Sequence, residues 1–282
     1  MELFKDTAEV FIPDGAPEAE AFARCTHIAI GCHQDDIEIM AYEGVLQTFG
    51  HKDKWLCAVT VTNGAGSART GPYADYTDEE MMQIRRLEQK KAAYVGEYGV
   101  QILLDYPSSD VKSERTGEVI ADLKRIIQAT NAKVIYCHNL ADKHDTHVAT
   151  TLRTIQAIRE IPAAERPEKL YACEVWRDLD WMVDEDKVAF DVEAHPNLAS
   201  ALLGVFDSQD AGGKRYDLAS IGRRVAHATY YESHGVDQSS AINFAMDLTP
   251  LIQDDTLDIA QYVADHINRF AADVNDRVTK FT

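Results

Sequence analysis

Two short polar runs combine histidine with carboxylate at a spacing that suits metal chemistry. GCHQDD spans residues 31–36, and HNLADKHDTH spans residues 138–147. Imidazole and carboxylate both ligate zinc, and a catalytic zinc site uses three protein ligands and one water. His33 and Asp36 lie three residues apart at the start of a predicted helix, where both can face one ion, and His147 would supply a third ligand. The sequence therefore predicts a metal site formed by His33, Asp36 and His147.

Two neighbouring side chains have the chemistry to act on a bound substrate. Asp35 lies beside the predicted metal but points differently from Asp36, so its carboxylate can take a proton from the metal-bound water. Zinc lowers the pKa of such a water toward about 7. His144 lies one turn before His147 and can donate a hydrogen bond to the oxyanion of a tetrahedral intermediate. We predict Asp35 and His144 as the catalytic residues.

The two polar runs can form one site only if the strands before them end close together in the fold. Apolar runs at 25–32 and 133–138 end directly in the two polar segments, and longer helical patterns alternate with the strand-like runs. Such alternation predicts an α/β fold: a Rossmann-like parallel sheet with helices on both faces. In the commonest doubly wound order, the first and fourth strands flank the point where strand order reverses, and ligands bind there. The two polar runs are therefore expected to meet in one crevice.

The pattern changes after about residue 185. One more strand-like run follows, and then mainly helical segments, with a long helix predicted over about 255–280. No Pro/Ser linker, repeat or low-complexity tract separates the parts. We predict a single domain over 1–282, with a core at about 22–185 and a C-terminal extension at about 186–282 packed on it.

Composition excludes several classes of partner. The formal net charge is −19, so nucleic acid is not an expected partner, and an anionic membrane surface would not attract the chain. No apolar stretch is long enough for a membrane span, and the first residues predict no signal peptide. Five cysteines without a CxxC pair predict buried apolar side chains and a reducing, cytoplasmic location. The expected partner is a small molecule, and a homo-oligomer stays open.

The polar runs resemble those of a known family. CHQDD at 32–36 is similar to the AHPDD motif of the PIG-L/LmbE-like zinc N-deacetylases, and HDTH at 144–147 is similar to their HPDH motif. The pattern Arg85–Glu88–Ala92 and the late Glu232 also look like theirs. The resemblance spans roughly residues 25–235, and the first two motifs are its specific part.

The resemblance implies a function and a set of roles. Members fold as Rossmann-like α/β domains and remove acetyl groups from N-acetylglucosamine-type sugars. Carried over, His33, Asp36 and His147 hold one Zn²⁺, Asp35 is the general base and His144 is the electrophilic or acid partner. Another divalent metal such as Fe²⁺ stays open, because His/carboxylate sites are not very selective.

The chain also departs from the family pattern. Gln34 replaces the Pro of the first motif, and Thr146 replaces the Asp of the second, so a carboxylate that could orient His144 is missing or moved. Glu38 sits one position later than the usual acidic residue and is expected to point away from the site. These changes predict a substrate different from those of the well-studied members.

Arginines near the predicted crevice are candidates for substrate binding. Arg69 lies in the Gly-rich loop NGAGSARTG, and Arg85 lies on the helix after it. Either could contact a substrate hydroxyl or carboxylate, while surface charge pairing is the alternative for both.

Two other functions stay open. One is a zinc amidase that acts on a larger sugar or thiol conjugate with the same site. The other, from a different class, is a nucleotide-binding Rossmann module without hydrolysis, although the Gly-rich loop follows the second strand and does not open a helix as a dinucleotide fingerprint does.

Overall fold

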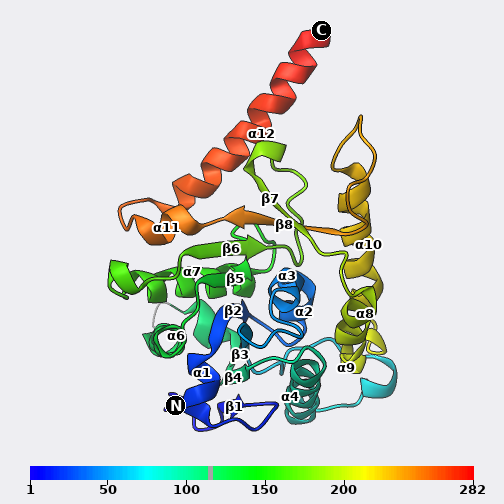
Figure 1. The fold of residues 1–282 in the computed structure, drawn as a ribbon. Helices are drawn as coiled ribbons and strands as arrows, with labels where there is room; N and C mark the ends of the chain where they lie inside the picture. Colours follow the sequence, from blue (N-terminus) through cyan, green and yellow to red (C-terminus); the bar gives the residue numbers. More distant parts are fainter. Residues whose placement is uncertain (114–116) are drawn as a thin grey trace.

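The computed structural model describes residues 1–113 and 117–282. Its strands form one mixed sheet in the order β1-β4-β3-β2-β5-β6-β8-β7 (Figure 1). The strands are β1 (Glu9–Phe11), β2 (Cys25–Gly31), β3 (Trp55–Thr62), β4 (Val100–Tyr106), β5 (Val134–His138), β6 (Lys169–Cys173), β7 (Lys187–Asp191) and β8 (Ile242–Asp247). The central strands β4, β3, β2, β5 and β6 are parallel, whereas β1, β8 and β7 pair antiparallel at the two edges.

Helices cover both faces of this sheet, as predicted. One face carries α6 and α7, and the other carries α2, α3, α4 and α8. The helices are α1 (Glu18–Ala23), α2 (Asp36–Met40), α3 (Tyr42–Leu46), α4 (Asp78–Val95), α5 (Ser108–Lys112), α6 (Gly117–Ala129), α7 (Asp145–Arg159), α8 (Pro196–Gly204), α9 (Asp207–Asp210), α10 (Tyr216–Tyr230), α11 (Thr249–Gln253) and α12 (Ile259–Phe281). The predicted Rossmann-like α/β fold is therefore confirmed.

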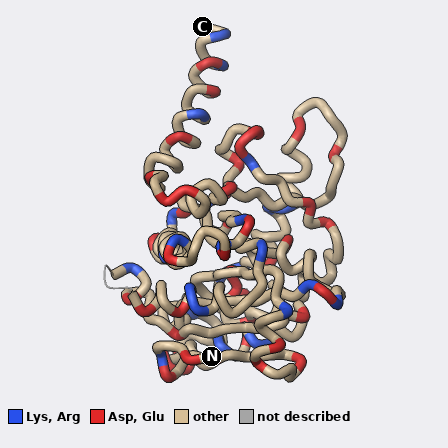
Figure 2. The backbone as a smooth tube through the Cα atoms, turned by 60° about the vertical axis from the view of Figure 1, so that its left-hand side comes forward, with Lys and Arg blue, Asp and Glu red and all other residues tan. Residues whose placement is uncertain are grey.

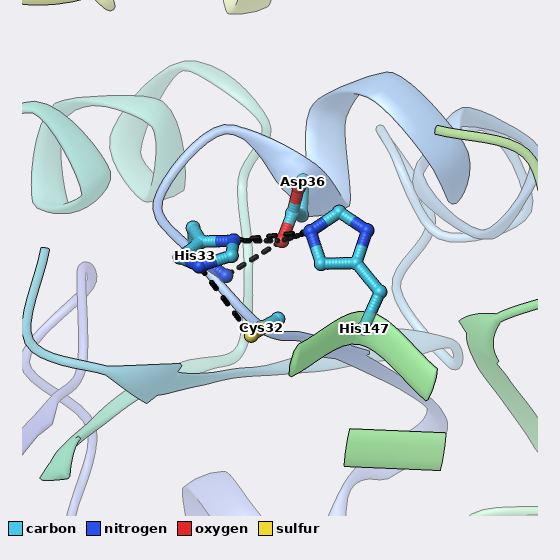
Figure 3. Close-up of side chains that lie close together, drawn as sticks. All are labelled: Cys32, His33, Asp36 and His147. Carbon is cyan, nitrogen blue, oxygen red and sulfur yellow. Dashed lines mark hydrogen bonds and ion pairs between the residues drawn. The ribbon is translucent and has the colours of Figure 1, made fainter. Parts of the chain in front are cut away.

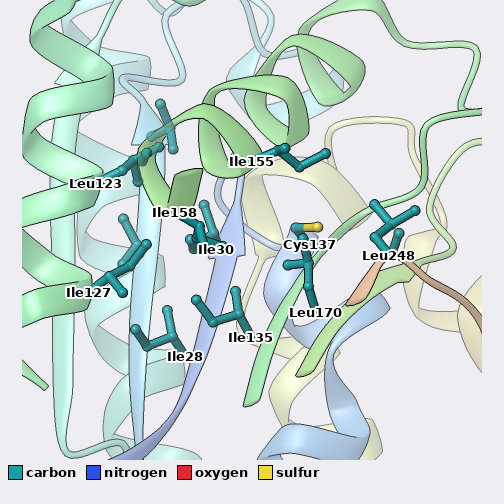
Figure 4. Close-up of a cluster of buried hydrophobic side chains, with 14 of the residues drawn as sticks. Ile28, Ile30, Leu123, Ile127, Ile135, Cys137, Ile155, Ile158, Leu170 and Leu248 are labelled. Atoms are coloured by element: carbon teal, nitrogen blue, oxygen red, sulfur yellow. The ribbon is translucent and has the colours of Figure 1, made fainter. Parts of the chain in front are cut away.

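The alternation of side chains along β2 explains why two cores form. Ile28 and Ile30 point into the core under α6 and α7, whereas Ala29 between them belongs to the core on the opposite face. Figure 4 shows Ile155 and Ile158 of α7 packed above the strand residues of the first core. Continuously apolar strands are needed because both faces are covered.

The helix predicted after β2 is broken into α2 and α3, and the break has a visible cause. The Arg224 guanidinium donates to the carbonyl oxygens of Glu38 (2.9 Å) and Ile39 (3.1 Å). The Asn243 amide donates to the carbonyl of Met40 at 3.4 Å. These side chains, from distant parts of the chain, satisfy the carbonyls that end α2. Local periodicity could not reveal this break.

The C-terminal part contributes more than helices. β7 and β8 extend the sheet beyond β6, and β8 was not predicted because a short, mainly apolar segment alone does not distinguish strand from buried helix. The last helix, α12, projects away from the body (Figure 1). It exposes an apolar stripe formed by Ile267, Phe270, Val274, Val278 and Phe281. Among the described residues, no helix is long and apolar enough to cross a membrane.

Candidate functional site

Strand order brings the two polar runs together. β2 and β5 pair in parallel, with Ala29 opposite Tyr136, so the segments that follow them leave the same edge of the sheet. Gly31 permits the tight exit from β2, because a Cβ there would lie 2.9 Å from the Ile37 side chain. Figure 3 shows the result: the side chains of His33 and Asp36 lie close to that of His147, which comes from α7.

The predicted metal ligands lie at the spacing that a small ion requires. His33 Nδ1 is 3.0 Å from His147 Nε2, and Asp36 Oδ2 is 3.3 Å from His33 Nδ1 and 3.4 Å from His147 Nε2. Zinc–ligand bonds of about 2.0–2.2 Å in a tetrahedron place neighbouring ligand atoms about 3.3 Å apart. The three donor atoms therefore match one triangular face of such a tetrahedron, and this donor set fits a divalent metal. His33 Nδ1, Asp36 Oδ2 and His147 Nε2 are called the metal triangle below.

The ring nitrogens that face away from this triangle are also held. His147 Nδ1 lies 3.3 Å from Asp142 Oδ2, and His33 Nε2 lies 3.6 Å from Cys32 Sγ. A histidine that ligates a metal usually hydrogen bonds through its other nitrogen, which fixes its tautomer and orientation. Cys32 belongs to the same group of donor atoms within 4.8 Å, but it contacts the outer nitrogen of His33. We therefore assign it to positioning that ring.

Two of the three predicted ligands have protonation states that favour metal binding. Burial lowers the pKa of His147 to about 3, so its imidazole is neutral and Nε2 has a free lone pair. Burial alone would raise the pKa of Asp36, but the adjacent His147 and His138 rings hold it well below its usual range. A neutral imidazole and an ionised carboxylate are the forms that ligate zinc. Burial alone would lower the pKa of His33, but Cys32 and Asp36 raise it well above its usual range, so a metal that binds His33 must displace its proton.

His138 has a separate role at the end of β5. The Cys32 backbone N–H donates to His138 Nε2 at 2.8 Å, and the His138 ring stacks on His147 with centroids 3.9 Å apart. Because this nitrogen accepts a backbone hydrogen bond, His138 fixes the end of β2 and supports the His147 ring.

Asp35 is buried beneath the cavity in a strained conformation. Its φ of 86° lies in the left-handed region, where a residue without glycine's freedom needs support from its surroundings. Gln89 supplies that support by accepting from the Asp35 backbone N–H at 3.2 Å, and the Arg85 guanidinium donates to Asp35 Oδ2 at 2.8 Å. Asp35 Oδ1 has no hydrogen-bond partner among the described residues. Burial raises the pKa of Asp35 to about 7, against the opposing effect of Arg85.

His144 lies beside the metal triangle without a carboxylate partner. Its ring stacks on His147 at 4.5 Å and meets His33 edge-on at 4.9 Å. Its Nδ1 is buried and has no hydrogen-bond partner within residues 1–113 and 117–282. Burial, followed by the His33 charge, lowers the pKa of His144, which favours the neutral ring. Asp142, which could have oriented it, contacts His147 instead.

A cavity of about 380 Å³ opens over these groups. His33, Asp35, Asp36 and His144 line this cavity, and Trp176 contributes a partly buried aromatic wall. This volume is within the range for small-molecule sites.

The two predicted substrate-binding arginines occupy different places. Arg85 lines the cavity but is itself buried, and it pairs with both Asp35 and Glu88 and donates to the Gln34 carbonyl. Arg69 does not line the cavity: its guanidinium donates to the Ala65 and Tyr76 carbonyls and pairs with Asp78. In the structure, Arg85 therefore holds the Asp35 carboxylate, and Arg69 joins the Gly-rich loop to the start of α4.

Glu38 points away from the metal triangle, as expected. Its Oε1 accepts hydrogen bonds from the Tyr98 hydroxyl (2.8 Å) and the Gln89 amide (2.9 Å), and the side chain is fully buried. Burial raises the pKa of Glu38 to about 7.

Sequence reasoning missed Asp142 and Trp176. Asp142 was visible as an acid five residues before His147, but only the fold shows which histidine it reaches. Trp176 follows β6 and is positioned by its backbone N–H, which donates to Asp142 Oδ2 at 3.2 Å. Asp142 therefore links the backbone of Trp176 to the His147 ring.

Comparisons with solved structures show the same fold. GalB, the 4-carboxy-2-hydroxymuconate hydratase from Pseudomonas putida KT2440, superposes with a TM-score of 0.60 at 14% identity, covering 79% of this chain and 96% of that one. The conserved protein TT1542 from Thermus thermophilus gives 0.61 at 16% identity, covering 79% and 94%. N,N'-diacetylchitobiose deacetylase from Pyrococcus horikoshii gives 0.57 at 16% identity, covering 79% and 84%.

Comparison at the sequence level is more selective. No curated protein sequence matches the chain significantly. Residues 28–158 match the family model PIG-L, described as GlcNAc-PI de-N-acetylase. This segment contains the whole metal triangle together with Asp35 and His144. The PIG-L resemblance expected from the CHQDD and HDTH motifs is therefore confirmed over residues 28–158.

Proposed function

We propose that the chain is a metal-dependent N-deacetylase that removes an acetyl group from an N-acetylated amino sugar or a related small glycoside. The observation that carries this proposal is the triangle of His33, Asp36 and His147 donor atoms beside Asp35 in a small cavity. The match to a de-N-acetylase family model supports it, as do the deacetylases with the same fold.

The reaction follows from the groups around the cavity. A divalent metal, Zn²⁺ or alternatively Fe²⁺, would supply a Lewis acid that activates water at neutral pH. Asp35 accepts the proton of the attacking water, whose oxygen bonds to the acetyl carbon. The C–N bond then breaks, and Asp35 returns the proton to the leaving nitrogen, so that the products are acetate and a free amine.

The surrounding residues prepare Asp35 and the carbonyl for this reaction. Arg85 holds Asp35 Oδ2 and leaves Oδ1 for the proton. A pKa of about 7 suits a base that both takes and returns a proton near neutral pH. The neutral His144 imidazole is placed to donate a hydrogen bond to the carbonyl oxygen as negative charge develops on it.

Acetate release tests the proposal directly. Protein loaded with one equivalent of zinc should release acetate from at least one member of a panel of N-acetylated amino sugars, and chelation should abolish the release. Absence of acetate from the whole panel, with metal content verified, would refute a deacetylase of amino sugars.

The same experiment distinguishes the rival functions. An amidase acting on a larger conjugate would release a larger acid. The hydratase GalB shares the fold, and hydration would consume an unsaturated substrate without forming any acid and amine pair. A nucleotide-binding module would be stabilised against heat by NAD or ATP and not by zinc.

Location and assembly stay predictions. The five cysteines are all buried and unpaired, which supports a reducing, cytoplasmic setting. The exposed apolar stripe on α12 supports a homo-oligomer, because large exposed apolar patches on soluble proteins often mark interfaces.

A further inference from the structure

Two lysines line the mouth of the cavity. Lys112 ends α5, and Lys214 lies just before α10, so residues distant in the sequence bring two ammonium groups to one opening. Neither forms an ion pair with any acid of the described chain. The chain has 47 acidic and 28 basic residues, and its acidic positions are spread over the whole molecule (Figure 2), so two lysines that line one cavity form a local basic site on an acidic protein.

The acidic side chains that line this cavity are engaged elsewhere. Asp35 and Asp36 are the acidic residues among the described cavity lining; Asp35 is paired with Arg85, and Asp36 completes the metal triangle. Near Lys214 in the sequence, Asp217 pairs with Arg215 at 2.7 Å. Lys112 and Lys214 therefore have no ion-pair partner among the described residues.

Trp176 connects the basic opening to the catalytic groups. The Lys214 ammonium lies 5.0 Å from the centre of the Trp176 ring, and the Lys143 ammonium lies 5.9 Å from it. The same ring stacks with His144 at 6.4 Å between centroids. A sugar ring against Trp176 would therefore have its acetamide near His144 and its other end near the lysines.

We infer that the substrate carries an anionic group, a carboxylate or a phosphate, which Lys112 and Lys214 bind at the mouth of the cavity. This inference rests on the proposed deacetylation of an amino sugar and names the class of amino sugar. Ammonium groups act as point charges for phosphate and carboxylate. They also attract an anion locally to a chain whose net charge would otherwise repel it.

Equilibrium binding tests this inference without turnover. The probes are N-acetylglucosamine, N-acetylglucosamine 6-phosphate and N-acetylmuramic acid, which differ in charge and in the type of anionic group. Titrations compare the wild type with Lys112→Gln, Lys214→Gln and the control Lys91→Gln, an exposed lysine of α4 away from the cavity. At least one anionic probe should bind about tenfold tighter than the neutral sugar. Each of the two rim variants, Lys112→Gln and Lys214→Gln, should reduce this preference about three- to tenfold. The control should keep the preference, and added salt should weaken it.

Equal binding of neutral and anionic probes, no binding of any probe, or an unchanged preference in both rim variants would overturn the inference. Which anionic probe binds better identifies phosphate or carboxylate as the group. Parallel acetate measurements separate the two proposals. Tighter binding of an anionic probe without acetate release supports anion binding by the lysines and refutes deacetylation. Acetate release without tighter binding of an anionic probe supports deacetylation and refutes anion binding by the lysines.

Discussion

Asp142→Asn should weaken metal binding without touching a metal ligand. Asp142 Oδ2 accepts from the Trp176 backbone N–H and faces His147 Nδ1, while Oδ1 accepts from the His144 backbone N–H. An asparagine amide must place its NH₂ group against one of these donors. If NH₂ faces His147, Nδ1 becomes an acceptor and the ring proton moves to Nε2, the atom that faces His33 and Asp36. That tautomer blocks the lone pair needed by the metal.

The size of the effect follows from the role of such partners. Loss of the residue that orients a ligating histidine typically costs 10- to 100-fold in metal affinity, which is about 1.4–2.7 kcal/mol. Competition with a chromophoric zinc chelator at pH 7.5 measures this change.

Burial raises the pKa of Asp142, but the contact with His147 lowers it below its ordinary value overall. Its carboxylate therefore stabilises the folded protein at neutral pH, and this contribution is lost only as the pH falls through the folded-state pKa.

Asp145→Asn is the matched control. Asp145 begins α7, is exposed and does not line the cavity, and its substitution removes the same charge as Asp142→Asn. Its affinity for zinc should remain within about twofold of the wild type. A wild-type zinc affinity for Asp142→Asn, or an equal loss in both variants, would show that the Asp142–His147 contact does not control the ligand.

Further substitutions test the ligand, the base and the buried carboxylate separately. His147→Ala should retain less than about a tenth of an equivalent of zinc after dialysis, and full occupancy by elemental analysis would contradict its role as ligand. Asp35→Asn should keep one equivalent of zinc but lower kcat for acetate release by about 10²- to 10⁴-fold, and near-normal release would exclude it as the base. Glu38 keeps its proton to about pH 7 in the folded state but to about 4.5 when unfolded, so the wild type loses up to about 3 kcal/mol of stability as the pH rises between these values. Glu38→Gln should remove that slope in denaturant titrations at pH 5 and 8, and an unchanged slope would refute the assignment.

The convergence of the two polar runs could be predicted because it depends on topology. Parallel strands with helical crossovers leave few arrangements, and the commonest places the first and fourth strands of the parallel set side by side. Here β2 and β5 take those places, so the chain reaches His33 and His147 from adjacent strand ends. The histidine and aspartate residues in the two motifs then predicted a metal site, and the fold brings these side chains close together.

The partners of those residues could not be predicted, because they come from side-chain contacts between distant segments. For Arg85, substrate contact and charge pairing were both open, and only the fold shows that its guanidinium reaches Asp35 Oδ2. Asp142 lies close to both His144 and His147 in the sequence, and the turn before α7 decides that it faces His147. Similarly, the end of α2 depends on Arg224, which lies 186 residues from Glu38.

The departure at Thr146 has a consequence for how protons move in the proposed reaction. A histidine held by a carboxylate favours its charged form and can deliver a proton to the leaving group. In this chain the nearby carboxylate, Asp142, holds the metal ligand His147, and His144 Nδ1 has no partner among the described residues. Burial and the neighbouring His33 then lower the pKa of His144, so it is a neutral hydrogen-bond donor and a poor acid. In the proposed reaction we therefore expect the proton that reaches the amine to come from Asp35, whose pKa of about 7 allows it to serve in both directions.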